Sequence, residues 1–211
     1  MNSRLKNHLA LLALSIGALG AAAISGPAAT FADRLSIVSA YLCLLLLGLA
    51  LLIGPASVLR NGRLAVNSYI RRDTGIWAAT TGLLHFYLAN VLSMNYEYLG
   101  TYVENATTLP TAAVRSTLYT SGTIAGYIIA VLFIILLALS SDWMLRKVGL
   151  KWWKRMQRLS YLGFILTCIH AFEFQMLETR PLFWVVVVAA IAVVTFTGQY
   201  IGFLAVRRNP Q

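Results

Sequence analysis

The sequence predicts an all-α integral membrane protein, built as a six-transmembrane-helix bundle. Two observations carry this prediction: 59% of the 211 residues are hydrophobic, and only 11% are charged. Soluble domains carry roughly 25% charged residues, so this chain has too few charged side chains to cover a water-facing surface. The composition therefore excludes an ordinary soluble domain, and we expect membrane lipid around the bundle.

The predicted helices follow from the lengths of the apolar segments. A helix needs about 20 apolar residues to cross the hydrocarbon core of a bilayer. Six segments of the single transmembrane domain 1–211 meet this requirement, and they cover residues 9–31, 36–59, 74–93, 118–140, 159–178 and 181–206. The first segment has an alternative interpretation as a signal peptide cleaved near Thr30 and Ala32. The later spans keep their orientation in both interpretations.

The basic residues alternate between the two sides of this bundle. With six spans, 14 of the 17 Lys and Arg residues fall on the side of both termini, and only Arg34, Arg115 and Arg180 fall on the other. Short loops rich in Lys and Arg stay in the cytoplasm. We therefore expect a protein of the inner membrane with cytoplasmic N and C termini. The net charge of +10 then reflects topology, and we expect no nucleic-acid partner.

Two histidines lie inside predicted spans at the same depth. His85 follows Asp73 by 12 residues in the third span, and His170 follows Arg158 by 12 residues in the fifth. Both helices run outward, so a rise of about 1.5 Å per residue places both imidazoles roughly 18 Å from the inner boundary. Ionisable groups at this depth are costly and mark candidate functional sites.

Facing imidazoles at one depth favour the axial ligand pair of a b-type haem between the third and fifth helices. Small residues on the same faces leave room for a flat ring: Ala78, Thr81 and Gly82 beside His85, and Gly163 and Thr167 beside His170. The alternative is that the histidines only tie helices together and the small residues only pack them closely. The third histidine, His8, lies at the inner start of the first span, so at most one bis-histidine haem can form.

Other polar residues inside the spans carry less information. Glu173, one turn beyond His170, is interpreted either as a proton relay or contact on the outer side, or as a carboxylate paired with Arg115 or Arg180. Cys43 and Cys168 fall in apolar runs and are interpreted as small buried thiols. This placement excludes a disulfide framework and a CxxC metal site.

Two stretches of the sequence resemble the ferric-reductase-like transmembrane domain family. One runs from Arg71-Arg72-Asp73-Thr74-Gly75-Ile76-Trp77 to Leu84-His85-Phe86, and the other from Ser141-Asp142-Trp143 through Trp153-Lys154-Arg155-Met156-Gln157-Arg158 to Ile169-His170. Within the family, the chain most resembles the small haem-binding membrane subunits of bacterial periplasmic methionine sulfoxide reductases. The resemblance covers roughly residues 35–205. It implies a six-helix haem b protein that moves electrons outward, with His85 and His170 at the outer ligand positions.

Departures from the family pattern limit the expected cofactors. Members often carry another histidine where this chain has Gln157, and larger relatives have one near Arg71, so we expect one haem b and no inner haem. These inner positions lie roughly 20 Å from the retained pair along the helices. We therefore expect FMN or a quinone head group near Arg71, Arg72 and Gln157, held by guanidinium and amide hydrogen bonds. The alternative is that the arginines only anchor the helix at the membrane surface.

The sequence ends at Gln211 without the nicotinamide–flavin domain that the oxidase relatives append. We therefore expect electrons from a separate cytoplasmic flavin reductase or from membrane quinol, passed to an outer acceptor such as a periplasmic reductase subunit. The chain is then the electron-transfer component of an oxidoreductase system. Two alternatives stay open: an autonomous transmembrane reductase of ferric or cupric ions, oxygen or quinone, and a haem-free membrane scaffold or transporter subunit.

Overall fold

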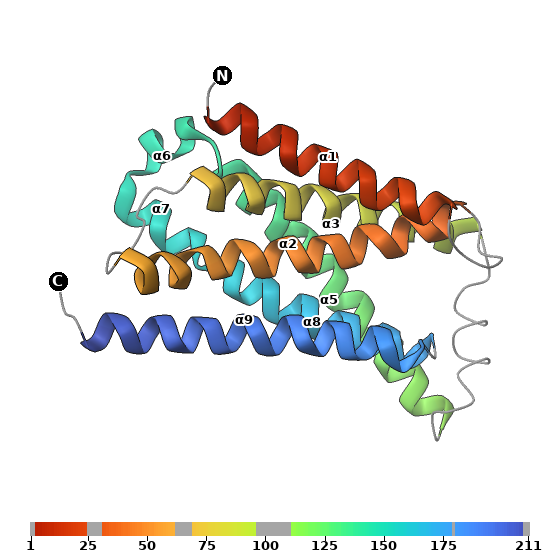
Figure 1. Cartoon of the computed structure of the whole chain (residues 1–211). Coiled ribbons are helices and arrows are strands. Elements are labelled where there is room, and N and C mark those ends of the chain that lie inside the picture. Colours follow the sequence, from red (N-terminus) through yellow and green to blue (C-terminus); the bar gives the residue numbers. More distant parts are fainter. Residues whose placement is uncertain (1–2, 25–30, 62–68, 96–110, 179, 209–211) are drawn as a thin grey trace.

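The computed structural model of the protein describes residues 3–24, 31–61, 69–95, 111–178 and 180–208. Every secondary-structure element in these ranges is a helix (Figure 1). In chain order the helices are α1 (Ser3–Ile24), α2 (Phe31–Asn61), α3 (Tyr69–Asn95), α5 (Ala112–Leu139), α6 (Asp142–Val148), α7 (Leu150–Gln157), α8 (Leu159–Leu177) and α9 (Leu182–Arg208). The predicted all-α class is confirmed.

Four segments of the described ranges are long and apolar enough to cross a membrane: Phe31–Arg60, Ala112–Leu139, Leu150–Leu177 and Leu182–Arg208. They correspond to the second, fourth, fifth and sixth predicted spans. Helices α1 and α3 take the places of the first and third, and the count of six stays a prediction. The predicted first span includes Phe31, which the structure assigns to α2; α1 is described as far as Ile24, and residues 25–30 lie outside the described ranges.

Helix α3 is more polar than these four segments. Its threonine hydroxyls are satisfied inside the helix: Thr74, Thr80 and Thr81 donate to the backbone carbonyls of Ile70, Ile76 and Trp77, at 2.8, 2.9 and 2.9 Å respectively. A hydroxyl bonded to the preceding turn brings no unpaired polar group into an apolar environment. The polarity of α3 is therefore compatible with a place inside the bundle.

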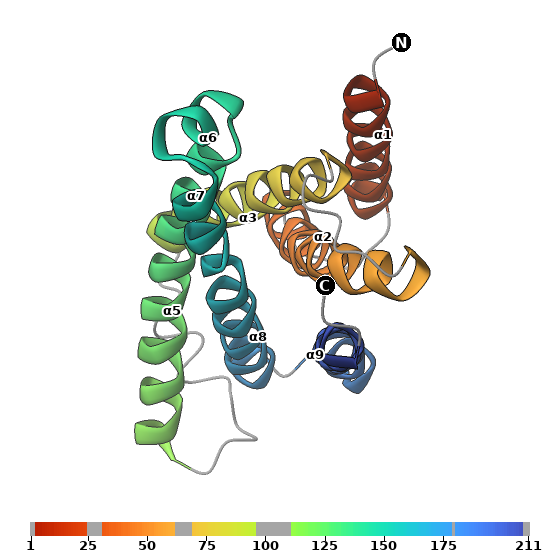
Figure 2. The same ribbon diagram turned by 90° about the vertical axis from the view of Figure 1, so that its left-hand side faces the viewer.

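The helices form a bundle with two distinct ends. Both chain termini lie at the end that carries α6 and α7, and the turn between α8 and α9 lies at the opposite end (Figure 1). We call these the α6–α7 end and the opposite end. Helix α2 runs through the middle and packs on α1, α3, α8 and α9, while α5 packs on α8 and α3 (Figure 2).

The core of the bundle is apolar and centres on α2. Its buried side chains include Leu44, Leu46, Phe133, Phe164 and Val188. Cys43 and Cys168 are buried free thiols, which confirms their prediction. In contrast, α5 and α9 expose large apolar side chains on their outward faces, among them Ile124, Val131, Ile134, Phe183, Val193 and Val194. Apolar faces of this extent are typical of surfaces that contact lipid.

Helix α9 supplies a hydrogen-bond donor to a backbone carbonyl of α2 that has no partner within its own helix. Pro55 lies inside α2 and lacks the amide hydrogen that the Leu51 carbonyl would accept. Gln199 of α9 supplies the missing donor, with its Nε2 at 2.6 Å from the Leu51 oxygen. The two helices approach this closely because Gly202 faces Pro55, where a Cβ atom would lie 2.8 Å from the proline Cβ. Gln199 therefore ties α9 to α2.

Candidate functional site

His85 of α3 is held in place by a hydrogen bond from one ring nitrogen to α2. Its Nδ1 lies 2.9 Å from the backbone oxygen of Ser36 on α2, and the Ser36 hydroxyl lies 3.1 Å from the same nitrogen. A carbonyl oxygen can only accept, so this bond places the imidazole proton on Nδ1. The lone pair of the neutral ring is then on Nε2.

His170 is held on α8 in the same way. Its Nδ1 lies 2.8 Å from the backbone oxygen of Gly122 on α5, which again places the proton on Nδ1. Gly126, one turn further along α5, lies against the ring: a Cβ atom there would be 3.2 Å from Cε1 and 3.4 Å from Nδ1. The absence of a side chain at Gly126 lets α5 support the ring so closely.

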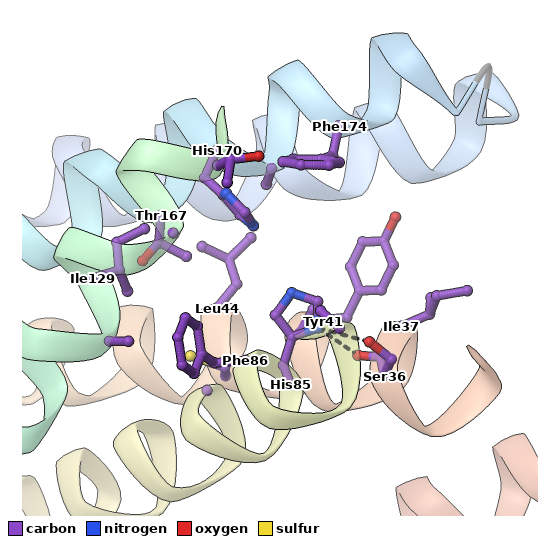
Figure 3. Close-up of a pocket in the computed structure, with 18 of the residues that line it drawn as sticks. Ser36, Ile37, Tyr41, Leu44, His85, Phe86, Ile129, Thr167, His170 and Phe174 are labelled. Atoms are coloured by element: carbon purple, nitrogen blue, oxygen red, sulfur yellow. Dashed lines mark hydrogen bonds between the residues drawn. The ribbon is translucent and has the colours of Figure 1, made fainter. Parts of the chain in front are cut away.

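The two imidazoles face one another across the bundle, as the matched depth predicts. Their ring centroids are 6.1 Å apart and their planes are inclined by 72° (Figure 3). Imidazole nitrogens bind first-row metals at about 2 Å, so two rings that share one ion have centroids roughly 6 Å apart. Metal-bound histidines commonly donate the other ring N–H to a carbonyl. Both the spacing and the Nδ1 bonds therefore suit one shared metal ion.

The two rings line a cavity of about 500 Å³ between α2, α3, α5 and α8. This volume is within the range of about 300–1,000 Å³ that is usual for cofactor and ligand pockets. Apolar side chains form most of its walls, among them Phe133 and, as Figure 3 shows, Leu44, Phe86, Ile129 and Phe174. Polar side chains gather toward the opposite end of the bundle, and they include Asp33, Tyr41, Gln175, Glu178 and Arg180.

The residues present fit a metal that brings further ligands with it. Within the described ranges, no group of three or more His, Cys, Asp or Glu side chains could hold a metal ion. Two imidazoles alone supply the axial ligands of a haem, whose ring supplies the other four nitrogens. The mostly apolar walls beside His85 and His170 suit such a ring.

The predicted small residues divide into two groups. Gly82 and Thr167 line the cavity, as expected. Ala78 and Thr81 are buried in helix packing, and a Cβ atom on Gly163 would meet only the ring of Phe133, at 3.8 Å; these three do not appear in the cavity wall.

Sequence reasoning missed the residues that orient the histidines. These are Ser36, Gly122 and Gly126. The pair Gly122 and Gly126 has the spacing at which small residues let membrane helices approach closely. That spacing was the available signal for the glycines. No comparable signal existed for Ser36, which acts through its backbone oxygen.

His8 lies apart from this pair and uses both of its ring nitrogens within the protein. Trp77 donates to its Nδ1 at 3.2 Å, and its Nε2 lies 3.3 Å from Oδ1 of Asp73. Asp73 is fully buried and also accepts from Arg4 at 3.3 Å and from Asn7 at 3.0 Å. His8 is therefore part of a polar cluster that joins α1 to α3.

The two arginines of the predicted flavin or quinone site, Arg71 and Arg72, contact different helices in the structure. Arg72 is buried, donates to Asp142 at 2.7 Å and to the Ser140 carbonyl at 2.5 Å, and lies beside the ring of Trp153. Arg71 instead lies beside α2, where its Nη1 would be 3.5 Å from a Cβ atom on Gly54.

Gln157, the third residue of the predicted flavin or quinone site, ends α7 and so lies at the α6–α7 end. Within the described ranges, the amide nitrogen of Gln157 is buried and has no hydrogen-bond partner. The interaction of Arg72 with Asp142 lowers the pKa of that carboxyl, mainly through the hydrogen bond. Arg72 therefore joins α3 to α6, and Arg71 and Gln157 remain as the residues not used by this link.

Glu173 does not form the predicted ion pair with Arg180. It accepts a hydrogen bond from the Ser121 hydroxyl at 2.7 Å, and Arg180 pairs with Glu178 instead. The pairing with Arg180 was wrong because residues 178 and 180 flank the same turn at the end of α8, where the two side chains meet directly. Glu173 instead ties α8 to α5 beside the Gly122 turn that holds His170.

One comparison with known proteins places the chain in a family. A family model described as ferric reductase like transmembrane component matches residues 35–168, which is more than half of the chain and includes His85. No curated protein and no solved structure gives a significant match. The family match confirms the resemblance that the motifs around His85 and Gln157 indicate. The chain belongs to the ferric-reductase-like transmembrane family.

Proposed function

We propose that the protein is a haem b membrane electron-transfer protein, with Nε2 of His85 and Nε2 of His170 as the axial ligands of one haem. Membership of the family supports a membrane electron-transfer or oxidoreductase function. The observation that carries the haem assignment is the pair of imidazoles, 6.1 Å apart, each with its Nδ1 occupied by a backbone carbonyl. A bound haem would supply reversible one-electron chemistry at its iron.

The residues of the chain would position and isolate this group. The Ser36 and Gly122 carbonyls fix the tautomer and orientation of the two rings, so both nitrogen lone pairs point into the cavity. Leu44, Phe86 and Phe133 keep the walls apolar. An apolar surround with little water access is one of the factors that set the redox potential of a haem.

The direction of electron transfer in this proposal follows from charge. The excess of Lys and Arg at the α6–α7 end favours a cytoplasmic position for that end, with both termini, and hence six spans in the inner membrane. The donor, a cytoplasmic flavin reductase carrying FMN or a membrane quinol, would then act at the α6–α7 end. The acceptor, such as a periplasmic reductase subunit, would dock at the opposite end.

The donor site in this proposal lies near Arg71, Arg72 and Gln157. His85 is 14 residues from Arg71 along the chain, so the site is roughly 20 Å from the haem ligands along α3. Arg72 is largely committed to Asp142, which assigns the contacts with a flavin phosphate or a quinone carbonyl mainly to Arg71 and Gln157. A guanidinium donates to phosphate, and an unpartnered amide N–H donates to a carbonyl.

A second candidate function is an autonomous reductase at the opposite end. The observation that favours it is the position of Asp33 and Glu178 in the cavity wall at that end. Carboxylates attract ferric or cupric ions to the edge of the site. Reduction of a soluble ferric chelate by the isolated, quinol-reduced protein would favour this candidate over transfer to a protein partner.

The experiment that tests the proposal is the visible spectrum of the purified protein before and after dithionite. We expect the sharp bands of a low-spin b-type haem in the reduced state. A colourless protein with native helical content would contradict the proposal and favour the haem-free scaffold. In sealed vesicles with the α6–α7 end inside, haem reduction by quinol followed by oxidation with an impermeant outer acceptor tests the direction.

A further inference from the structure

Two tyrosines in the cavity wall use their hydroxyl groups differently. Tyr127 of α5 donates its proton to Oδ1 of Asn90 at 2.8 Å. Tyr41 of α2 instead accepts, from Nε2 of Gln175 on α8 at 3.0 Å. A phenol hydroxyl that accepts a hydrogen bond still has its own proton to donate. Within the described part of the chain, no acceptor for the Tyr41 proton is found.

The direction of the bond between Gln175 and Tyr41 is fixed by a third group. The same Nε2 donates to the backbone oxygen of Trp184 at 3.1 Å, and a carbonyl oxygen can only accept. The amide nitrogen of Gln175 must therefore face Tyr41. Gln175 is only 6% exposed, and the ring of Tyr41 packs on the ring of Trp184 with centroids 4.6 Å apart. The hydroxyl of Tyr41 is thus held in one place, with its proton available.

The position of this hydroxyl relates it to the histidine pair. Tyr41 extends from α2 toward α8 within the cavity (Figure 3). Gln175 follows His170 by five residues on α8, which places it about 7.5 Å further along the helix axis. Arg180 and Glu178, which form an ion pair, line the same end of the cavity, as does Asp33. A ligand centred between the histidines therefore meets a neutral O–H donor near its edge.

We propose that Tyr41 donates this hydrogen bond to a carboxylate of the haem, and that Gln175 is the positioning residue for the Tyr41 hydroxyl. This inference rests on the proposed haem function. A haem has two carboxylates at one edge of an otherwise apolar ring, each on a two-carbon arm, and the cavity offers mostly apolar walls around the histidines and polar groups at one end. The bond would fix which edge of the ring faces the opposite end of the bundle.

The test compares haem b with its dimethyl ester, in which both carboxylates are neutral esters. Haem-free protein is reconstituted with each pigment as wild type, Tyr41→Phe, Gln175→Leu and Tyr127→Phe, and affinity is measured by titration of the b-type spectrum. Wild type is expected to bind the ester about tenfold more weakly, as for loss of a hydrogen bond to a charged group. In Tyr41→Phe the two pigments should bind with nearly equal affinity.

The other two variants make the result specific. Gln175→Leu should reduce the tenfold difference, because the Tyr41 hydroxyl loses the bond that orients it. Tyr127→Phe is the matched control and should keep the full difference, because the Tyr127 proton is already donated to Asn90. An equal ratio of affinities in wild type and Tyr41→Phe, or no difference between the pigments in wild type, would overturn the inference. A wild type that binds neither pigment with a b-type spectrum would instead refute the proposed function.

Discussion

The polar cluster around Asp73 at the α6–α7 end and the histidine cavity use their histidines in opposite ways. At the α6–α7 end, Asp73 is bonded by Arg4, Asn7 and His8, and Arg72 is bonded to Asp142. In the cavity, His85 and His170 are each fixed through Nδ1, while within the described residues Nε2 has no hydrogen-bond partner.

The three histidines show what this difference teaches. His8 has both ring nitrogens engaged and therefore acts as a structural link between α1 and α3. The two cavity histidines keep one nitrogen for a ligand. A histidine inside a membrane protein is thus best interpreted from which of its nitrogens are used, since burial and depth alone do not separate the two roles.

The largest stability effect is expected at Asp73. Replacing it with Ala leaves Arg4 and His8 without their buried partner, and removal of one partner of a buried ion pair is strongly destabilising. Because Arg4 is partly exposed, we expect a loss of about 2–3 kcal/mol in the free energy of unfolding. Thermal unfolding in detergent measures this loss. Haem bound per folded chain should stay unchanged, and a parallel loss of haem would show that the two regions are not independent.

A smaller effect is expected behind His170. Gly126→Ala places a methyl group 3.2 Å from Cε1 of His170, and crowding of this kind costs about 1–3 kcal/mol or displaces the ring. We expect weaker haem binding and a shifted spectrum. Gly75→Ala is the matched control, since a Cβ atom there meets nothing within 4 Å. That variant should keep the wild-type spectrum and gain up to about 1 kcal/mol from helix propensity.

The smallest effect is expected at Asp142, and it depends on pH. Arg72 lowers the pKa of Asp142 in the folded protein, so the interaction stabilises the fold above the unfolded pKa of about 3.9 and is lost as pH falls through the lower folded value. Asp142 is partly exposed, which limits the gain to less than about 1 kcal/mol. Unfolding temperatures between pH 6 and pH 3 should show a shallower acid limb in Asp142→Asn. Identical pH profiles would contradict a role for the pair.

The sequence predicts the long elements of this fold well because apolar length determines them. The predicted bounds 159–178 and 181–206 lie close to α8 and α9. The predicted first span runs into α2 because residues 20–32 carry no charged side chain and are mostly small or apolar, so hydropathy gives no sharp boundary there.

In the candidate site, too, some features could be predicted from the sequence and others could not. Helical rise predicts that His85 and His170 lie at the same depth, because each follows a charged residue at the predicted inner boundary by 12 residues. Their partners were not predictable, because Ser36 and Gly122 act through backbone carbonyls whose positions depend on how α2 and α5 pack. The neighbours Arg71 and Arg72 were expected to act together, but adjacent residues on a helix point in different directions. Arg72 is directed to α6 and Arg71 to α2.

The most direct test of the account is haem content per chain in His8→Ala, His85→Ala and His170→Ala, measured on equal amounts of folded protein. We predict about one haem in wild type and in His8→Ala, because His8 serves the link to Asp73, with His8→Ala reduced only in thermal stability. Either cavity variant should lose the low-spin b-type spectrum, because each removes one of the two available nitrogens. A full complement of low-spin haem in the double variant His85→Ala/His170→Ala would contradict the account.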